Sequence, residues 1–382
     1  MKRILTLIMS ITLFFCSLPI YSQATEENAP FELKAKSAVL MDAESGEILY
    51  AKNADEALPP ASVTKVMTLL LVMEAIEEGI IKLEDMVSVS ENAASMGGSQ
   101  VFLEVGEQMS VDEMLKCVVA SSANDAAVAL AEKVAGSEAS FIQRMNERAK
   151  ELGMDNTNFE NATGLDDNVT NHTISAHDIA VASRELITKH PKIFDYTTIW
   201  MDTIRNGAFG LSNTNRLIRF YNGATGLKTG STSKAGFCIS ATAKRENMHL
   251  IAVIMGSATR DERNAAVTTL LDWGFATYSV YTAEGGDAGE VKLTGGDSDK
   301  IKLEYGSFTK LLGKGKERKI TTETKLPESV AAPVKKGDKV GSIKYLCDGQ
   351  MIGEVDITSA EDVDRIGFFE ILLRFWQNYC MF

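Results

Sequence analysis

Cysteine is scarce in this chain, with five residues among 382. Those beyond residue 24 are far apart and include no Cys-x-x-Cys pair. The spacing therefore excludes a dense disulfide framework and gives no indication of a cysteine-bound zinc ion. A single disulfide and four free thiols are both compatible with the sequence. The four cysteines are Cys117, Cys238, Cys347 and Cys380.

Histidine is also rare, with four residues, and offers little for a metal site. His172, His177 and Asp178 are close in the sequence, but a loop followed by the start of a helix explains them without a bound ion. We therefore predict no metal and no other cofactor.

Positive charge is in deficit. The chain has 39 lysines and arginines against 52 aspartates and glutamates, for a net charge of −13. Such a chain repels a phosphate backbone, so we predict no nucleic-acid partner. Because 45% of the residues are hydrophobic and 24% are charged, the chain can bury a sizeable core.

The N-terminus has the pattern of a secretory signal peptide. Lys2 and Arg3 precede an apolar run over residues 4–20, and Ser22-Gln23-Ala24 supplies small residues at the spacing that a signal peptidase recognises. A membrane anchor is the alternative, but the run is short and is interrupted by polar residues and a proline. The sequence therefore predicts removal of residues 1–24 and an exported protein.

The C-terminus, residues 365–382, has the pattern of an amphipathic helix. Its polar residues recur at offsets of four, seven and eight, which places them on one narrow stripe, and aromatic and aliphatic residues cover the rest. A helix of this kind lies in a membrane interface, so we expect peripheral attachment to the outer face of the cytoplasmic membrane. Docking on the protein's own core is the alternative. The polar stripe consists of Glu370, Arg374, Gln377 and Asn378.

Between these ends the order of elements predicts an α+β domain over residues 25–281 and a small all-β domain over residues 282–364. The second region has glycine pairs, short strand-like segments and no helical periodicity. The first region mixes strands and helices: a hairpin over residues 37–53, a buried helix over 61–78, helices from 111 and from about 125, strands over 237–243 and 248–254, and a helix over 261–278.

Ser62-Val63-Thr64-Lys65 places a hydroxyl and an amine about one turn apart on the same face, at the start of the buried helix. Apolar neighbours would lower the pKa of Lys65 by desolvation, so that this amine could take a proton from Ser62. The motif alone is weak, because Ser231 and Ser307 begin similar tetrapeptides, and a helix-capping serine is the plainer explanation. The double proline before Ser62 and the apolar helix after it favour a catalytic role.

Two further motifs offer complementary chemistry. Ser122-Ala123-Asn124 occupies a short break between two helices, where the hydroxyl could relay a proton and the amide could hold the base and a substrate carbonyl. Lys228-Thr229-Gly230 opens a strand, where the glycine would let a substrate backbone approach and the lysine would supply a fixed positive charge for a carboxylate. Helix capping and a solvated lysine on an edge strand are the alternatives for these motifs.

In combination, Ser-x-x-Lys, Ser-x-Asn and Lys-Thr-Gly in this order form the signature of penicillin-binding proteins and serine β-lactamases. The chain resembles the low-molecular-mass D-alanyl-D-alanine carboxypeptidases over essentially its whole length, including Asn161-Ala162-Thr163-Gly164-Leu165 and Lys234-Ala235-Gly236-Phe237. The resemblance implies a transpeptidase-like domain with an antiparallel five-stranded sheet beside a helical lobe, followed by the β domain and the membrane-binding tail.

The resemblance also implies the roles of the site residues. Ser62 would be acylated by the penultimate D-alanine of a peptidoglycan stem peptide or by a β-lactam antibiotic, with Lys65 as the base. The remaining residues would serve proton transfer, the oxyanion hole and recognition of the terminal carboxylate. They are Ser122, Asn124, Lys228, Thr229, Gly230, Ser231 and Arg216.

Two departures from relatives matter. Ser231 stands where some relatives have histidine, and the segment from Asn161 has no Glu-x-x-x-Asn of the kind that deacylates class A β-lactamases. We therefore predict a carboxypeptidase that binds penicillin. The alternatives are a β-lactamase, a D,D-endopeptidase or a non-catalytic penicillin-binding scaffold of the cell wall.

Overall fold

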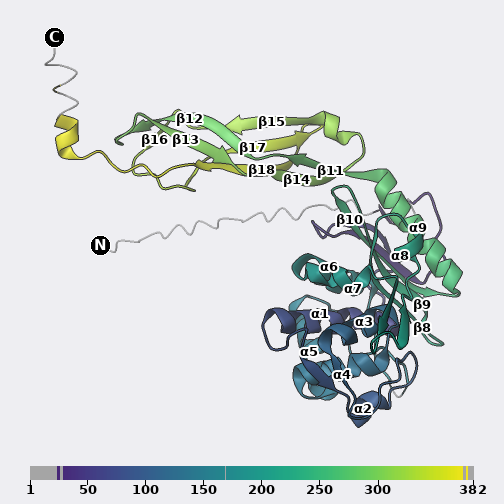
Figure 1. Ribbon diagram of the computed structural model, residues 1–382. Coiled ribbons are helices and arrows are strands. Elements are labelled where there is room, and N and C mark those ends of the chain that lie inside the picture. Colours follow the sequence, from purple (N-terminus) through teal and green to yellow (C-terminus); the bar gives the residue numbers. More distant parts are fainter. Residues whose placement is uncertain (1–23, 26–28, 168, 373–375, 377–382) are drawn as a thin grey trace, which may run out of the picture.

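The computed structural model describes residues 24–25, 29–167, 169–372 and 376 (Figure 1). An antiparallel sheet of five strands, in the order β3-β2-β10-β9-β8, forms the centre of the first domain, and the two-residue strand β1 lies parallel to β3 at one edge. The expected α+β class is thus confirmed. The strands are β1 (Ala24–Thr25), β2 (Ser37–Asp42), β3 (Ile48–Lys52), β8 (Ala224–Thr232), β9 (Gly236–Arg245) and β10 (Met248–Ser257).

Helices cover both faces of this sheet. Most of them form a lobe on one face, and α9 packs on the other (Figure 1). Short two-stranded ribbons, β4 with β5 and β6 with β7, border the lobe. The helices are α1 (Lys65–Glu77), α2 (Glu91–Ala94), α3 (Val111–Ala120), α4 (Asn124–Ala135), α5 (Glu138–Glu151), α6 (Ala176–Lys189), α7 (Phe194–Thr197), α8 (Leu217–Phe220) and α9 (Arg260–Thr277), and the ribbon strands are β4 (Met86–Ser88), β5 (Gln108–Ser110), β6 (Met201–Ile204) and β7 (Phe209–Ser212).

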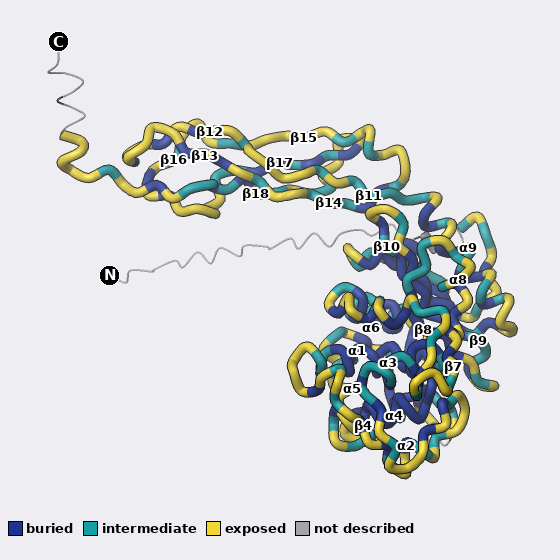
Figure 2. The backbone as a smooth tube through the Cα atoms, viewed as in Figure 1, coloured by how far each residue is buried: buried dark blue, intermediate teal, exposed yellow. Residues whose placement is uncertain are grey.

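The alternation of side chains along the central strands creates two cores. Val39 and Met41 of β2 point into the helical lobe, whereas Ala38 and Leu40 point toward α9. Because both faces of the sheet are covered, its middle strands are buried at most positions. Figure 2 shows this buried interior beneath a largely exposed outer layer.

The beginning of the helix predicted over residues 61–78 differs from the expectation. Its first turn is a 3-10 turn, η2 (Ala61–Thr64), and the α-helix starts only at Lys65. Ala61 has a left-handed backbone with φ of 49°, directly after two prolines, and cannot continue a regular helix backward. The turn presents Ser62 ahead of the helix, whereas Lys65 is within its buried first turn.

The second domain is all β, as expected, and extends away from the first (Figure 1). A six-stranded sheet in the order β15-β17-β18-β13-β12-β16 accompanies the pair β11 and β14, and a separate apolar core lies inside it. The strands are β11 (Tyr278–Ala283), β12 (Gly286–Thr294), β13 (Lys300–Tyr305), β14 (Phe308–Gly313), β15 (Ile320–Lys325), β16 (Ser329–Ala331), β17 (Lys339–Cys347) and β18 (Gln350–Ser359), with 3-10 turns η3 (Pro191–Ile193) in the first domain and η4 (Lys316–Lys319) in the second.

The two ends of the chain are described only in part. The predicted signal peptide lies outside the described residues apart from Ala24. Residues 368–372 and Trp376 are helical and lie at the end of the β domain that is remote from the helical lobe. Within the described part of the chain, no helix combines the length and the apolar character needed to cross a bilayer.

Phe141 of α5 packs in the core of the helical lobe, so Phe141→Ala should strongly lower the stability of the protein. Phe141 is 0% exposed, so the substitution leaves a cavity in the core and should lower the free energy of unfolding by about 3–5 kcal/mol. Urea denaturation of the purified protein measures this change. Phe369→Ala is the matched control, because Phe369 is 84% exposed and its removal should change the free energy by less than about 0.5 kcal/mol. Equal effects of the two substitutions would contradict the assigned core.

Candidate active site

The Ser62 hydroxyl and the Lys65 amine meet at the junction of η2 and α1. Lys65 Nζ lies 3.1 Å from Ser62 Oγ, as the three-residue spacing predicts. Lys65 is 0% exposed, whereas Ser62 lines a cavity of about 680 Å³. The nucleophile candidate is therefore accessible from the cavity, and its neighbouring amine is withdrawn from water.

Two further acceptors fix the orientation of the Lys65 amine. Its Nζ donates to Asn124 Oδ1 at 2.6 Å and to the carbonyl oxygen of Thr163 at 2.8 Å. Both oxygens can only accept, whereas the Ser62 hydroxyl can also donate. In the neutral amine the two hydrogens therefore stay on Asn124 and Thr163, and the lone pair is left for the proton of Ser62.

Burial favours this neutral form. Desolvation, and after it the nearby positive charge of Lys228, hold the pKa of Lys65 well below its usual range, and the negative charge of Asp125 opposes them in part. A lysine in these surroundings is suited to accept a proton near neutral pH. The expected lowering of the Lys65 pKa thus has the cause that the sequence indicated.

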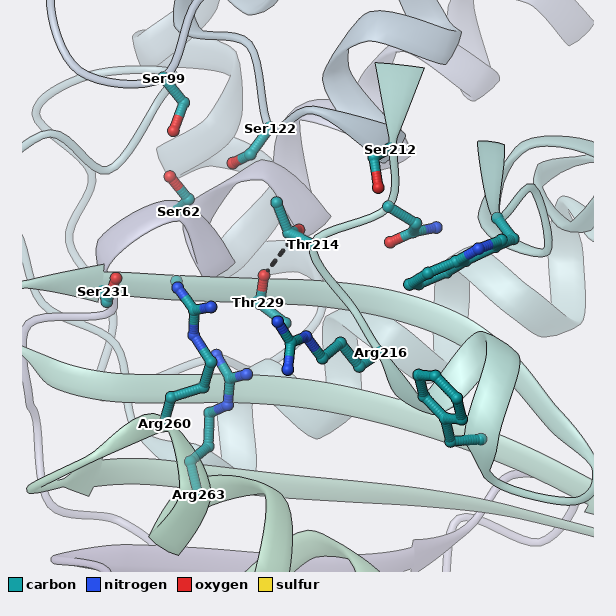
Figure 3. Close-up of a pocket in the computed structure, with 14 residues that line it drawn as sticks. Ser62, Ser99, Ser122, Ser212, Thr214, Arg216, Thr229, Ser231, Arg260 and Arg263 are labelled. Atoms are coloured by element: carbon teal, nitrogen blue, oxygen red, sulfur yellow. Dashed lines mark hydrogen bonds between the residues drawn. The ribbon is translucent and has the colours of Figure 1, made fainter. Parts of the chain in front are cut away.

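Ser122 and Asn124 lie in the tight break between α3 and α4. Ser122 has a left-handed backbone with φ of 59°, and the carbonyl of Cys117 accepts the N–H groups of Ser121 and Ala123. Such a conformation is unfavourable for a residue other than glycine and persists where the surroundings enforce it. The break turns Ser122 toward the cavity, where it lies near Ser62 (Figure 3).

Lys228 contacts Ser122, whereas the sequence suggested that it would bind a substrate carboxylate. Its side chain is 1% exposed and donates to Ser122 Oγ at 2.8 Å and to the carbonyl oxygen of Thr229 at 3.0 Å. Desolvation, followed by the charge of Arg263, lowers the pKa of Lys228 to about 7. Lys228 is therefore a buried partner of Ser122 whose charge depends on pH, and not a fixed positive charge that faces the cavity.

Gly230 brings strand β8 against the start of η2. A Cβ atom at this position would lie 2.7 Å from the backbone nitrogen of Ser62 and 2.9 Å from that of Val63. Contacts this short do not occur in folded proteins, so only glycine fits here. The sequence suggested that Gly230 admits a substrate; in the structure it admits the backbone of the nucleophile's own turn.

Three arginines surround the other end of the cavity, below Thr229 and Ser231 in Figure 3. Arg216 was expected here, whereas Arg260 and Arg263 at the start of α9 were not. Among the described residues, none of the three forms an ion pair. Thr229 lies beside them and donates to Thr214 Oγ1 at 2.8 Å. The cavity is therefore strongly cationic, although the chain as a whole is acidic.

Arg263 is the most constrained of these arginines. Its side chain is 3% exposed, and within the described chain its guanidinium donates to Asn264 Oδ1 at 2.9 Å and 3.2 Å. Burial, and then the charge of Arg260, lower the pKa of Arg263 to about 10. Arg263 is thus a buried cation that has no counter-ion in the described part of the chain, and an anionic ligand would supply one.

The segment over residues 161–165 supplies the Thr163 carbonyl. Asn161 Oδ1 accepts the backbone N–H groups of Thr163 and Gly164, and Gly164 packs so closely on η2 that a Cβ there would meet the carbonyl oxygen of Ala61. Nearby, His172 Nε2 lies 2.8 Å from Thr64 Oγ1. The sequence had marked the segment only through its family resemblance, because a backbone acceptor leaves no signal in residue identity.

Comparison with known proteins gives a consistent result. Residues 23–259 match the family described as D-alanyl-D-alanine carboxypeptidase, and residues 275–365 match the C-terminal domain of penicillin-binding protein 5. The chain is 41% identical to D-alanyl-D-alanine carboxypeptidase DacF of Bacillus subtilis, with all of both chains covered.

Solved structures agree. Penicillin-binding protein 5 of Haemophilus influenzae has a TM-score of 0.75 and 33% identity, covering 88% of this chain and 99% of that one. Penicillin-binding protein D2 of Listeria monocytogenes in its ampicillin-bound form has a TM-score of 0.60 and 32% identity, covering 65% of this chain and 99% of that one.

The close approach at Gly230 predicts that Gly230→Ala impairs the reactivity of Ser62. The added methyl group must displace the backbone amide of Ser62, and we expect a fluorescent penicillin to label the protein at least about 100-fold more slowly, which is the usual effect of losing one oxyanion donor. Gly210→Ala is the matched control, because a Cβ at Gly210 meets nothing within 4 Å. An unchanged labelling rate in Gly230→Ala would show that the contact is unimportant.

Proposed function

The chain belongs to the D-alanyl-D-alanine carboxypeptidase family and is a serine-type carboxypeptidase of peptidoglycan, and on that basis we propose how its residues perform the reaction. Ser62 is the nucleophile and Lys65 is its base. The observation that carries this assignment is the set of contacts of Lys65 Nζ, which leave its lone pair directed at Ser62. The reaction removes the terminal D-alanine of a pentapeptide stem in two steps.

In the first step Lys65 takes the proton of Ser62, and Ser62 Oγ attacks the carbonyl carbon of the penultimate D-alanine. The backbone N–H groups of Ser62 and Ser231 stabilise the negative charge that forms on the carbonyl oxygen. The carbon–nitrogen bond then breaks, and the nitrogen leaves as the amine of free D-alanine. The product is an ester between Ser62 and the shortened stem.

Ser122 is the proton donor to the leaving nitrogen. Because Ser122 Oγ accepts a hydrogen bond from Lys228, its own hydrogen is free to point into the cavity. Lys65 returns the proton that it took from Ser62, through Ser122, so that the step is balanced. Asn124 holds Lys65 in place, and its side-chain nitrogen donates to the carbonyl of Gly97 at 2.7 Å.

In the second step water hydrolyses the ester. Lys65, neutral again, takes a proton from the water, the oxygen adds to the ester carbonyl, and Ser62 leaves with that proton. The same two N–H groups stabilise the second oxyanion. This route needs no residue beyond those that acylate Ser62.

The cationic end of the cavity recognises the free carboxylate of the stem. Thr229 can turn the hydrogen of its hydroxyl from Thr214 Oγ1 to this carboxylate, and Arg216, Arg260 and Arg263 offer guanidinium groups that form no ion pair among the described residues. Arginine pairs with a carboxylate through two parallel hydrogen bonds, which fixes orientation as well as charge. A substrate that ends in a free carboxylate is thereby preferred over one that does not.

A β-lactam would acylate the same serine, since it presents a reactive carbonyl and a carboxylate at a comparable spacing. The relative from Listeria monocytogenes was solved in an ampicillin-bound form. The missing Glu-x-x-x-Asn after Asn161 disfavours the alternative of a β-lactamase. The close contacts of Ser62 and Lys65 disfavour a non-catalytic scaffold.

The carboxypeptidase assignment predicts release of free D-alanine from a peptide that ends in D-Ala-D-Ala. Ser62→Ala should lower the rate by about 1,000-fold or more, because the nucleophile is lost. Ser307→Ala is the matched control. Ser307 begins another Ser-x-x-Lys sequence, which lies in the β domain; the residue is exposed there, and its replacement should leave the rate unchanged. D-alanine release that survives in Ser62→Ala would refute the assignment.

We also propose that the chain is exported with loss of residues 1–24 and attaches to the membrane through residues 365–382. Large apolar side chains in the described part of this tail support attachment, because at least half of the surface of each is exposed. They are Phe368, Phe369, Ile371, Leu372 and Trp376.

Deleting residues 367–382 should therefore release the protein from lipid vesicles into the soluble fraction without loss of activity. The truncation keeps Arg365 and Ile366, which hydrogen-bond to Ala332 and Gly295 of the β domain. Sedimentation with vesicles measures the effect, and D-alanine release serves as the control for folding. Continued sedimentation of the truncated protein would show that attachment lies elsewhere.

A further inference from the structure

The loop over residues 97–103 forms the wall of the cavity opposite strand β8. Ser99 lines the cavity from this loop, close to Ser62 and Ser122 in Figure 3. The loop has no regular secondary structure, so its shape depends on contacts with its neighbours. Those contacts come from two places, the start of α4 and the turn between β6 and β7.

The start of α4 contributes the densest set of contacts. The carboxylate of Asp125 accepts the backbone N–H groups of Val101 and Leu103, each at 3.1 Å, and that of Ala126 at 2.9 Å. The preceding residue, Asn124, donates its backbone N–H to the carbonyl of Ser99 at 2.7 Å. Asp125 is 1% exposed, so these hydrogen bonds form away from water.

Asp125 also acts electrostatically on the catalytic base. Asn124, which accepts the hydrogen bond from Lys65 Nζ, is the adjacent residue in the first turn of α4. From the elements packed around Lys65, the charged side chains that act on it are Lys228 on β8 and Asp125 on α4. Of these two, only Asp125 stabilises the protonated amine.

Resting on the proposed function, we propose that Asp125 is a positioning residue with two tasks: it fixes the loop over residues 97–103 beside the nucleophile, and its negative charge acts on the Lys65 amine. The mechanism assigned above does not use this carboxylate. Asp125 touches no reacting atom, and it acts through the loop backbone and through Lys65. One side chain thereby supports the substrate-binding wall and also opposes, in part, the lowering of the Lys65 pKa by burial and by Lys228.

A variant of Arg205 allows the two tasks of Asp125 to be tested separately. From the turn between β6 and β7 Arg205 donates to the carbonyl oxygens of Val101 at 2.9 Å and Phe102 at 3.1 Å, and it forms a two-pronged ion pair with Glu107. It therefore holds the same loop, but its charge is not among those that act on Lys65. An Arg205 variant loosens the loop and leaves the base unaltered.

The experiment compares the pH dependence of Ser62 acylation by a fluorescent penicillin in four full-length proteins. In the parent, the rate falls at low pH as Lys65 becomes protonated. We call this fall in rate the acid limb. Asp125→Asn removes the negative charge that favours protonation of Lys65, so the acid limb of this variant should move to lower pH by roughly one unit. Loosening of the loop should in addition reduce acylation at the alkaline plateau by about tenfold.

Asp125→Glu and Arg205→Gln complete the set. Both should weaken acylation at the plateau through the loop, and both should keep the acid limb at the parental pH, because the charge near Lys65 remains. If the limb of Asp125→Asn stays in place or moves to higher pH, or if Arg205→Gln moves it equally, the proposal is overturned. Should Asp125→Asn fail to fold, a shifted limb in Asp125→Glu, whose charge is retained, would overturn it as well.

Failure of the proposed function looks different. In that case the parent itself would release no D-alanine and would not be labelled at Ser62. A parent that is labelled normally, together with an unmoved limb in Asp125→Asn, would remove only the role of Asp125.

Discussion

The amine of Lys65 is the point on which the site depends. Its three partners come from separate parts of the chain: Ser62 from the turn before α1, Asn124 from the start of α4, and Thr163 from a loop. A buried amine without partners would be strongly destabilising, so these segments must meet for the fold to tolerate it. The same requirement that satisfies the amine also assembles the nucleophile and its base.

A second buried lysine extends this arrangement. Lys228 joins strand β8 to Ser122, and the like charges of Lys228 and Lys65 disfavour simultaneous protonation of both. Two residues beside these lysines, Ala61 and Ser122, have left-handed backbones that are unfavourable in isolation. Strain, burial and like charge are thus concentrated where the chemistry occurs, and the large cores on both sides of the sheet supply the stability that tolerates them.

Much of this could be predicted from the sequence. The order of strands and helices indicated the α+β fold and the β domain, and the spacing of Ser62 and Lys65 indicated a hydroxyl and an amine on one face. Ser122 could be placed because a capping box and a second helix bracket it. These signals are local: each is contained within a few residues or one helical period.

What could not be predicted depends on contacts between distant segments. Arg260 and Arg263 read as ordinary residues at the start of a helix, and only the packing of α9 on the sheet brings them to the cavity. The carbonyl of Thr163 and the N–H groups of Val101 and Leu103 belong to the backbone, which residue identity does not reveal. The 3-10 turn before α1 arises from the conformation of Ala61, and the propensities of its residues gave no sign of it.

The tight fit at Gly230 has a consequence for the emergence of antibiotic resistance. A larger side chain on β8 would be the direct way to exclude a bulky drug while still admitting a narrower peptide. At this position, however, any side chain collides with the nucleophile's own turn before it can reach the drug. Mutations that spare the enzyme while blocking inhibitors must therefore arise on other walls of the cavity, where side chains such as those of Ser99 and Arg216 form the surface.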